Sequence, residues 1–118
     1  MSGRVIALRT ISVEPTLDGA WAGTAIGGHP RTRTWNQYVS PDEKLLSGIW
    51  ECTPGVWNIN YTAWEFCHLI AGHCTITVEG QNPVELRAGD VFLVETGAVG
   101  TWTVHETIRK HYVFARGH

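Results

Sequence analysis

The middle of the chain reads Glu65-Phe-Cys-His-Leu-Ile-Ala-Gly72 and, further on, Gly89-Asp-Val-Phe-Leu-Val-Glu95-Thr-Gly97. Each block is a short run of β-forming residues bounded by glycine, as expected for a strand that ends in a turn. Similar runs recur from residue 47 onward, at 48–52, 56–61, 65–70, 73–79, 84–87, 91–94, 101–106 and 108–115. Closely spaced short strands with such turns are typical of a β-sandwich or barrel, and the tight turns favour antiparallel pairing.

Residues 1–46 are less regular than the rest of the chain. Pro and Gly interrupt them, and residues 31–39, which are rich in Thr and aromatic side chains, predict a strand or an extended arm. No segment has a convincing amphipathic helical period, and residues 42–46 would form one helical turn at most. We therefore expect a single domain over residues 1–118, in which residues 1–46 form an arm and strands and residues 47–115 form the core barrel.

Length and composition limit the class of protein. With 118 residues, 43% hydrophobic and 17% charged, the chain has the size and balance of one globular domain. Its net charge of −2 gives no electrostatic reason to bind nucleic acid, and it lacks the apolar run of about 18 residues that a membrane helix needs. The N-terminus has only four consecutive apolar residues, too few for a secretory signal, and the three cysteines are an odd number. These observations predict a cytoplasmic protein with reduced thiols.

The two blocks resemble the two sequence motifs of the cupin family. Glu65 and Gly72, with six residues between them, match the second half of the first motif. Gly89 and Gly97 match the second motif, with Glu95 where a proline is usual, and we expect Gly97 in a turn that needs a positive φ. The resemblance implies an all-β fold, a single cupin β-barrel of the kind also described as a double-stranded β-helix or jelly roll. It also implies a homodimer, and the N-terminal residues are expected either to wrap the barrel or to lie across the partner.

The resemblance is closer to a subfamily of small cupins that carries the name of ureidoglycine aminohydrolase. It covers about residues 45–115 and rests on Gly48-Ile-Trp50-Glu-Cys-Thr53-Pro-Gly55, Glu65-Phe-Cys67, Gly89-Asp-Val-Phe92, Gly100-Thr-Trp102 and Arg109-Lys110-His-Tyr112. Together these blocks are specific for the fold. They say little about the reaction, because one fold supports many functions.

The histidines that normally hold the metal ion of a cupin are absent. In the same alignment the first-motif histidines fall on Ile59 and Tyr61, and the second-motif histidine falls on Gly100. Glu65 remains, but one carboxylate does not make a zinc site, which takes about three protein ligands even when it is catalytic. We therefore assign no metal ligands, and the sequence firmly implies no cofactor. A divalent metal would need unusual ligands, such as the Cys67 thiolate with a displaced histidine.

Glu65 and Lys110 are the candidate catalytic residues. Alternate residues of a strand share a face, so Glu65, Cys67 and Leu69 point one way, and the resemblance places that face inside the barrel. A carboxylate buried there needs a partner, and Lys110 on the last strand is the natural candidate. Two roles are open for Lys110: a base or Schiff-base former with a lowered pKa, or a salt-bridge partner that only neutralises Glu65.

The candidate ligand-binding residues are expected to line the same interior: Trp50, Trp57, Tyr61, Cys67, Trp102 and Tyr112. Small-molecule pockets are mostly apolar with a few polar groups, which suits this set, although any one tryptophan could also be plain core. The first candidate function is an enzyme that binds and converts a small polar metabolite, such as a ureide, an amino compound or a sugar acid, with Glu65 and Lys110. The alternative is a non-catalytic ligand-binding or sensor cupin.

Overall fold

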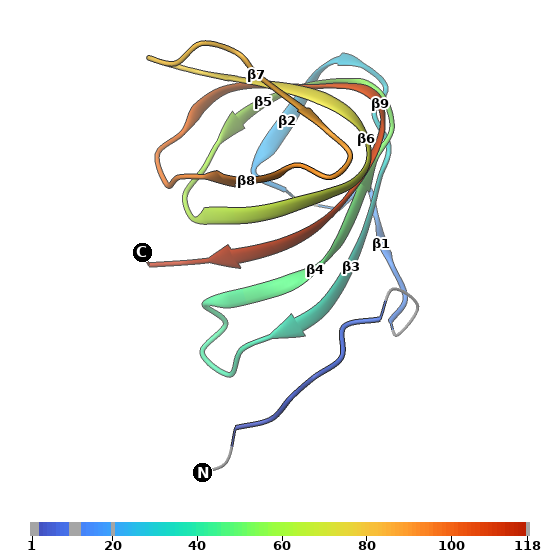
Figure 1. Cartoon of the computed structure of the whole chain (residues 1–118), viewed down its shortest axis with the longest axis vertical. Helices are drawn as coiled ribbons and strands as arrows, with labels where there is room; N and C mark the ends of the chain where they lie inside the picture. Colours follow the sequence, from blue (N-terminus) through green and yellow to red (C-terminus); the bar gives the residue numbers. More distant parts are fainter. Residues whose placement is uncertain (1–2, 10–12, 20, 118) are drawn as a thin grey trace.

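The computed structural model describes residues 3–9, 13–19 and 21–117, and in these ranges it consists of strands, turns and extended segments without a helix (Figure 1). The strands are β1 (Thr16–Leu17), β2 (Gly23–Gly28), β3 (Thr32–Val39), β4 (Leu45–Cys52), β5 (Gly55–Asn60), β6 (Trp64–Val78), β7 (Val84–Arg87), β8 (Val91–Val94) and β9 (Val99–Ala115). The described residues thus contain no helix that could span a membrane. The predicted all-β class is confirmed.

Two sheets share the two longest strands, β6 and β9. In the first sheet, the C-terminal half of β9 pairs with β4 and with the first half of β6, in the order β1-β3-β4-β9-β6-β8. In the second sheet, the N-terminal half of β9 pairs with β5 and with the second half of β6, in the order β2-β5-β9-β6-β7. All of these pairs are antiparallel, and the sheets curve together where β6 and β9 pass from one to the other (Figure 1). This is the predicted jelly-roll barrel.

Two of the predicted strand breaks are wrong, because β6 and β9 continue through them. β6 passes through Gly72, which has φ +91°, and there its pairing with β9 shifts register instead of ending. Such irregularities let one strand bend and belong to both sheets. A series of short apolar runs in the sequence does not predict that two of the runs form one continuous strand. The strand β2 is also not predicted from the sequence. Gly27 and Gly28, two of the glycines that interrupt residues 1–46, lie within it, and its pairing with β5 is irregular between Ala25 and Gly27.

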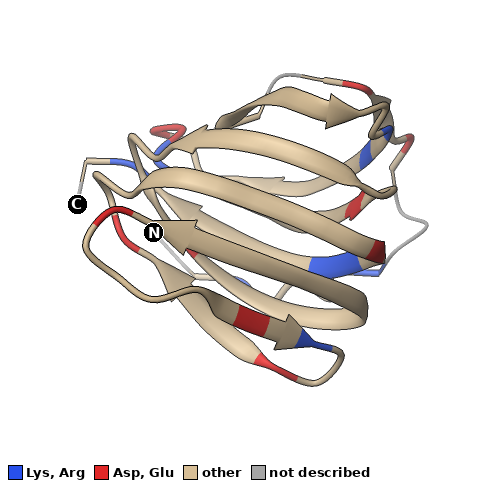
Figure 2. Ribbon diagram, turned by 90° about the horizontal axis from the view of Figure 1, so that it is seen from above, with Lys and Arg blue, Asp and Glu red and all other residues tan. Residues whose placement is uncertain are grey.

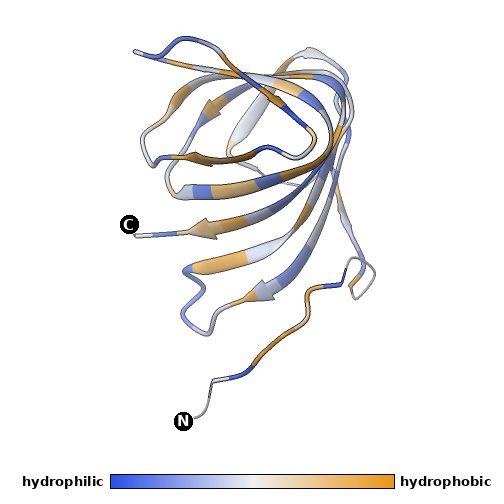
Figure 3. Ribbon diagram, in the orientation of Figure 1, coloured by the Kyte–Doolittle hydropathy of each residue, from blue (hydrophilic) through white to orange (hydrophobic). Residues whose placement is uncertain are grey.

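The faces of β6 alternate as predicted, and this places Glu65 in the interior. Along the first half of the strand, Glu65, Cys67 and Leu69 are buried and the residues between them are exposed. Figure 3 shows apolar and polar residues interspersed along the strands. The interior is otherwise mainly apolar and aromatic, and it includes Trp50, Cys52, Ile59, Cys67, Leu69, Cys74, Trp102, Val104 and Ile108.

Residues 3–9 extend away from the barrel (Figure 1). Val5 is 102% exposed, and Ile6 is exposed as well. One contact with the barrel is a hydrogen bond that the Gln37 side chain donates to the Arg9 carbonyl. The homodimer that the resemblance implies stays a prediction.

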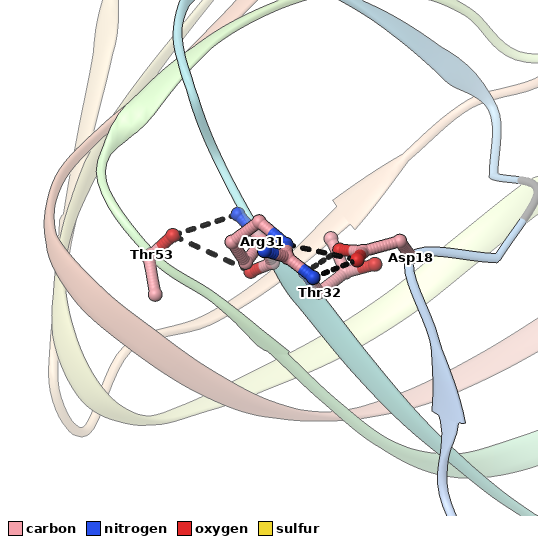
Figure 4. Close-up of polar contacts among 4 residues, drawn as sticks. All are labelled: Asp18, Arg31, Thr32 and Thr53. Carbon is pink, nitrogen blue, oxygen red and sulfur yellow. Dashed lines mark hydrogen bonds and ion pairs between the residues drawn. The ribbon is translucent and has the colours of Figure 1, made fainter.

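A polar cluster ties the segment after β1 to β3 and to the end of β4 (Figure 4). Asp18 accepts hydrogen bonds from Arg31 Nη2 at 2.6 Å and from the Thr32 backbone N–H at 3.0 Å. The Arg31 backbone N–H in turn donates to Thr53 Oγ1 at 2.7 Å. The hydrogen bonds from Arg31 and Thr32 hold the pKa of Asp18 below its ordinary value. Because the ion pair is largely exposed, we interpret the cluster as a modest structural tie.

Candidate functional site

A cavity of about 340 Å³ lies between the inner face of the first sheet and the segment that precedes β2. Aromatic side chains dominate its walls: Trp21, Trp50, Tyr61, Tyr112 and Phe114. The polar side chains that line it are Thr34, Asn36, Thr62, Glu65 and Arg116. Aromatic walls with a few polar groups are typical of a pocket for a small molecule.

Glu65 lies at the floor of this cavity, and both of its carboxylate oxygens accept hydrogen bonds. Lys110 Nζ donates to Glu65 Oε2 at 2.8 Å, and the Tyr61 hydroxyl donates to Glu65 Oε1 at 2.7 Å. Charged residues are scattered along the ribbon (Figure 2), and of these Glu65 and Lys110 are both 0% exposed. The predicted pairing of Glu65 with Lys110 is confirmed, and it supplies the partner that a buried carboxylate needs.

The surroundings of this pair determine its protonation. Burial acts to lower the pKa of Lys110, but the neighbouring Cys67 and Glu65 raise it, and the pKa lies above its ordinary value. Burial, reinforced by the charge of Glu65, raises the pKa of Tyr61 well above its ordinary value. Lys110 therefore stays protonated at neutral pH, and Tyr61 stays a donor. A base or Schiff-base lysine needs a lowered pKa, so the raised pKa of Lys110 favours the salt-bridge role.

Three tryptophans surround the ammonium group of Lys110. Its Nζ lies 4.4 Å from the ring centroid of Trp102, 4.7 Å from that of Trp50 and 5.6 Å from that of Trp21. Trp21 and Trp50 are stacked, with ring centroids 4.7 Å apart. The face of an indole ring attracts a cation, so the three rings offset part of the hydration that Lys110 loses on burial.

The structure divides the predicted site residues into two groups. Four of them line the cavity: Trp50, Tyr61, Glu65 and Tyr112. Four lie outside its lining: Trp57, Cys67, Trp102 and Lys110. Of this second group, Trp57 is half-buried and donates from Nε1 to Cys52 Sγ at 3.4 Å, and the other three are fully buried. A ligand in the cavity is therefore separated from Lys110 by the residues of the floor.

Most of the other residues of the cavity wall are not predicted from the sequence, among them Trp21, Asn36 and Arg116. Asn36 Oδ1 accepts a hydrogen bond from the Tyr112 hydroxyl at 2.9 Å, and the buried indole N–H of Trp21 has no hydrogen-bond partner among the described residues. Trp21 follows an irregular segment, where no strand period indicates a face. The only available signal for Asn36 is that it shares its strand face with Thr34.

The residues around Glu65 do not fit a divalent metal ion. The positions where cupin histidines are expected hold Ile59, Tyr61 and Gly100, and these leave Tyr61 as the one side chain with an oxygen. Both oxygens of Glu65 already have donors, one of which is a cation. Over the described residues, no group of three or more His, Cys, Asp and Glu side chains is arranged to hold a metal. We therefore derive no chemical step through a metal.

The three cysteines are predicted to be unreactive in the folded protein. All are free and buried. Burial raises the pKa of Cys52 and of Cys74 to about 11, and it raises the pKa of Cys67 well above its ordinary value. Because the thiolate is the nucleophile, we expect no alkylation by iodoacetamide at pH 8 in native protein and full alkylation in urea, measured by mass spectrometry. Rapid native labelling of Cys67 would instead identify an activated thiol.

The two-sheet barrel, with its aromatic cavity against the first sheet, places the chain among the cupin β-barrel proteins. More closely, it belongs to the family of the EutQ-like cupin domain, whose model matches residues 39–112. No curated protein matches the sequence significantly.

Solved structures share this fold. A protein of unknown function from the DUF861 family of Pseudomonas syringae has a TM-score of 0.78 at 23% identity, with 92% of this chain and 46% of that protein covered. The chain therefore spans about half the length of that protein. The EutQ protein of Clostridium difficile has a TM-score of 0.64 at 19% identity, covering 74% of this chain and 69% of EutQ. A DUF861 protein of Thermotoga maritima is 30% identical over 54% of this chain and 73% of its own, with a TM-score of 0.52.

Proposed function

We propose that this protein binds a small polar metabolite in the cavity against the first sheet. The observation that carries the proposal is a polar floor in an aromatic cavity: Glu65, paired with Lys110 and Tyr61, borders a space of about 340 Å³. A core has no need of such a pair, because replacing a buried ion pair by apolar residues is often neutral or stabilising. A role in recognition gives a reason to retain it.

A ligand that enters the cavity is expected to contact the residues of the wall before it reaches Glu65 at the floor. Glu65 is 0% and Tyr61 is 1% exposed, so a ligand reaches the carboxylate only if side chains of the floor shift. Asn36 and Trp21 lie on the wall, where the buried indole N–H of Trp21 has no hydrogen-bond partner among the described residues, and Arg116 lies on the exposed part of the wall. A donor without a partner and a cation both favour a ligand with acceptor groups, such as a carboxylate or a carbonyl.

Ureido acids and sugar acids fit these groups better than simple amines. The ureide class is supported further by the resemblance of Glu65-Phe-Cys67 and Arg109-Lys110-His-Tyr112 to the ureidoglycine aminohydrolase subfamily.

Binding without conversion is the better supported alternative. A general acid or base works best with a pKa near the operating pH. Three groups at or behind the floor have pKa values shifted further from neutrality: Tyr61, Cys67 and Lys110. The hydrogen bond from Tyr61 to Glu65 is the feature that would favour proton transfer instead.

The proposal is tested with a panel of ureides, amino compounds and sugar acids, first by thermal shift and then by calorimetry. For a ligand that binds, we expect Tyr112→Phe to weaken binding at least about 10-fold, because it removes the hydroxyl that Asn36 pairs with and leaves the ring in place. Arg33→Gln, at an exposed residue on the opposite face of the same strand from Asn36, should leave affinity unchanged.

Two results would contradict the assignment. One is the absence of binding across the three classes, and the other is an affinity that Tyr112→Phe does not change. Proton NMR of the ligand after prolonged incubation separates binding from conversion, because a new product would favour the enzyme.

A further inference from the structure

The ammonium group of Lys110 is surrounded in the way that proteins surround a bound ammonium ligand, by aromatic rings and a carboxylate. Its ammonium group has a carboxylate oxygen at 2.8 Å and three indole rings with centroids within 5.6 Å, and the residue is 0% exposed. The chain has only two lysines, and the other, Lys44, is exposed. The register explains the arrangement in part, because Trp50 and Lys110 are paired residues of β4 and β9.

We infer that Trp21, Trp50, Trp102 and Glu65 form an alkylammonium-binding cage and that the protein's own Lys110 occupies it. Aromatic rings and a carboxylate are the groups by which proteins recognise ammonium ligands, and here all of them converge on one Nζ atom. Three of the four cage residues belong to three different strands, and Trp21 belongs to the segment before β2. The cage therefore exists only in the folded barrel.

The occupied cage has a consequence for what else the site accepts. A metal ion or an amine that approached Glu65 would meet a fixed positive charge 2.8 Å from the carboxylate oxygen. Other cations are thus excluded from the cage unless the Lys110 side chain moves out of it. The cation that balances the charge of Glu65 is part of the protein chain itself. Trp21, Trp50 and Glu65 belong to both the cage and the cavity lining, but the inference does not rest on the proposed metabolite, since it concerns the ammonium group of Lys110, which lies outside that lining.

The first experiment uses the unmodified protein and compares its two lysines. A timed pulse of an acetylating N-hydroxysuccinimide ester, followed by peptide mass spectrometry, measures the rate at each amine. We expect Lys110 to react at least 100-fold more slowly than Lys44 in the native state and equally fast in urea. Native rates within 10-fold of one another would overturn the cage.

The second experiment empties the cage. Lys110→Ala removes three carbons and the nitrogen, so n-propylammonium is the fragment that replaces them. We expect n-propylammonium to raise the melting temperature of this variant in a saturable way, while 1-propanol and potassium chloride have no comparable effect. In Lys110→Ala with Glu65→Gln, the preference for propylammonium over propanol should be lost.

The cage can still be tested if the Lys110→Ala variant does not fold without an added ligand. The variant is then refolded from urea with n-propylammonium or with 1-propanol. Recovery with the ammonium alone supports the cage. Recovery with neither, or equal recovery with both, overturns it, because a site for an ammonium must distinguish charge from size.

Discussion

Glu65→Leu will remove most of the stability of this barrel. The substitution keeps the side-chain volume close to the original but leaves the Lys110 ammonium buried, at 0% exposure, without its carboxylate. Breaking a buried ion pair in this way costs about 3–5 kcal/mol. The Tyr61 hydroxyl also loses its acceptor, which adds about 1–3 kcal/mol. A domain of this size has a free energy of unfolding of about 5–15 kcal/mol, so urea denaturation followed by tryptophan fluorescence should show a large loss.

Two matched variants separate the charge from the packing. Glu65→Leu with Lys110→Met removes both charges, and it should be more stable than Glu65→Leu alone by about 3–5 kcal/mol, with only the loss at Tyr61 remaining. Arg33→Met breaks the exposed pair with Glu51 and should cost less than about 1 kcal/mol. A double variant as unstable as the single one would show that the unpaired ammonium is not the cause.

The Glu65–Lys110 pair could be predicted from the sequence, whereas the tryptophan cage could not. The two-residue period of a strand fixes which face Glu65 shares with Cys67, and the cost of a buried charge then requires a cation. The cage depends on which residues of different strands lie opposite one another. Trp50 faces Lys110 through the pairing of β4 with β9, and no local pattern states that register.

Trp21 shows the same limit for the cavity. It contributes to the cage and to the cavity wall, but it lies just before β2 (Gly23–Gly28). The glycines of β2 prevent that strand from being predicted. Strand prediction rests on apolar alternation, and a segment rich in glycine gives none. The part of the site that could be predicted is therefore the part built on regular strands, and the part brought in by an irregular segment required the structure.

The bend of the barrel also depends on Gly72. The sequence predicts a turn at this glycine, but it does not predict the close contact of Gly72 with β9. Gly72 lies where β6 passes from the first sheet to the second, at the register shifts between Ala71 and His73. A Cβ atom there would lie 2.2 Å from the Thr107 carbonyl oxygen and 2.8 Å from Ile108 Cα, and the φ of Gly72 is +91°. Both neighbours are backbone atoms of β9, so they cannot move aside without separating the two shared strands.

Gly72→Ala is accordingly expected to be the most damaging of the glycine substitutions at positive φ. The left-handed backbone costs an L-residue about 1–3 kcal/mol, and forcing an atom into a filled space adds about 1–3 kcal/mol or more. Because β6 and β9 belong to both sheets, the strain is expected to reduce the stability of the whole barrel. Urea denaturation should show a loss of about 2–6 kcal/mol, and a cooperative transition with a much smaller loss would contradict the close approach of the two strands.

Gly97→Ala is the control that isolates the packing contribution. Gly97 has the predicted positive φ, at +94°, but a Cβ atom there would have nothing within 4 Å. The Gly97→Ala variant should therefore lose only the free energy of about 1–3 kcal/mol that a left-handed backbone costs an L-residue. The difference between the two variants then measures what the close contact of β6 with β9 contributes, independently of the cost of the left-handed backbone. Equal losses would mean that the backbone conformation, and not the contact, makes Gly72 necessary.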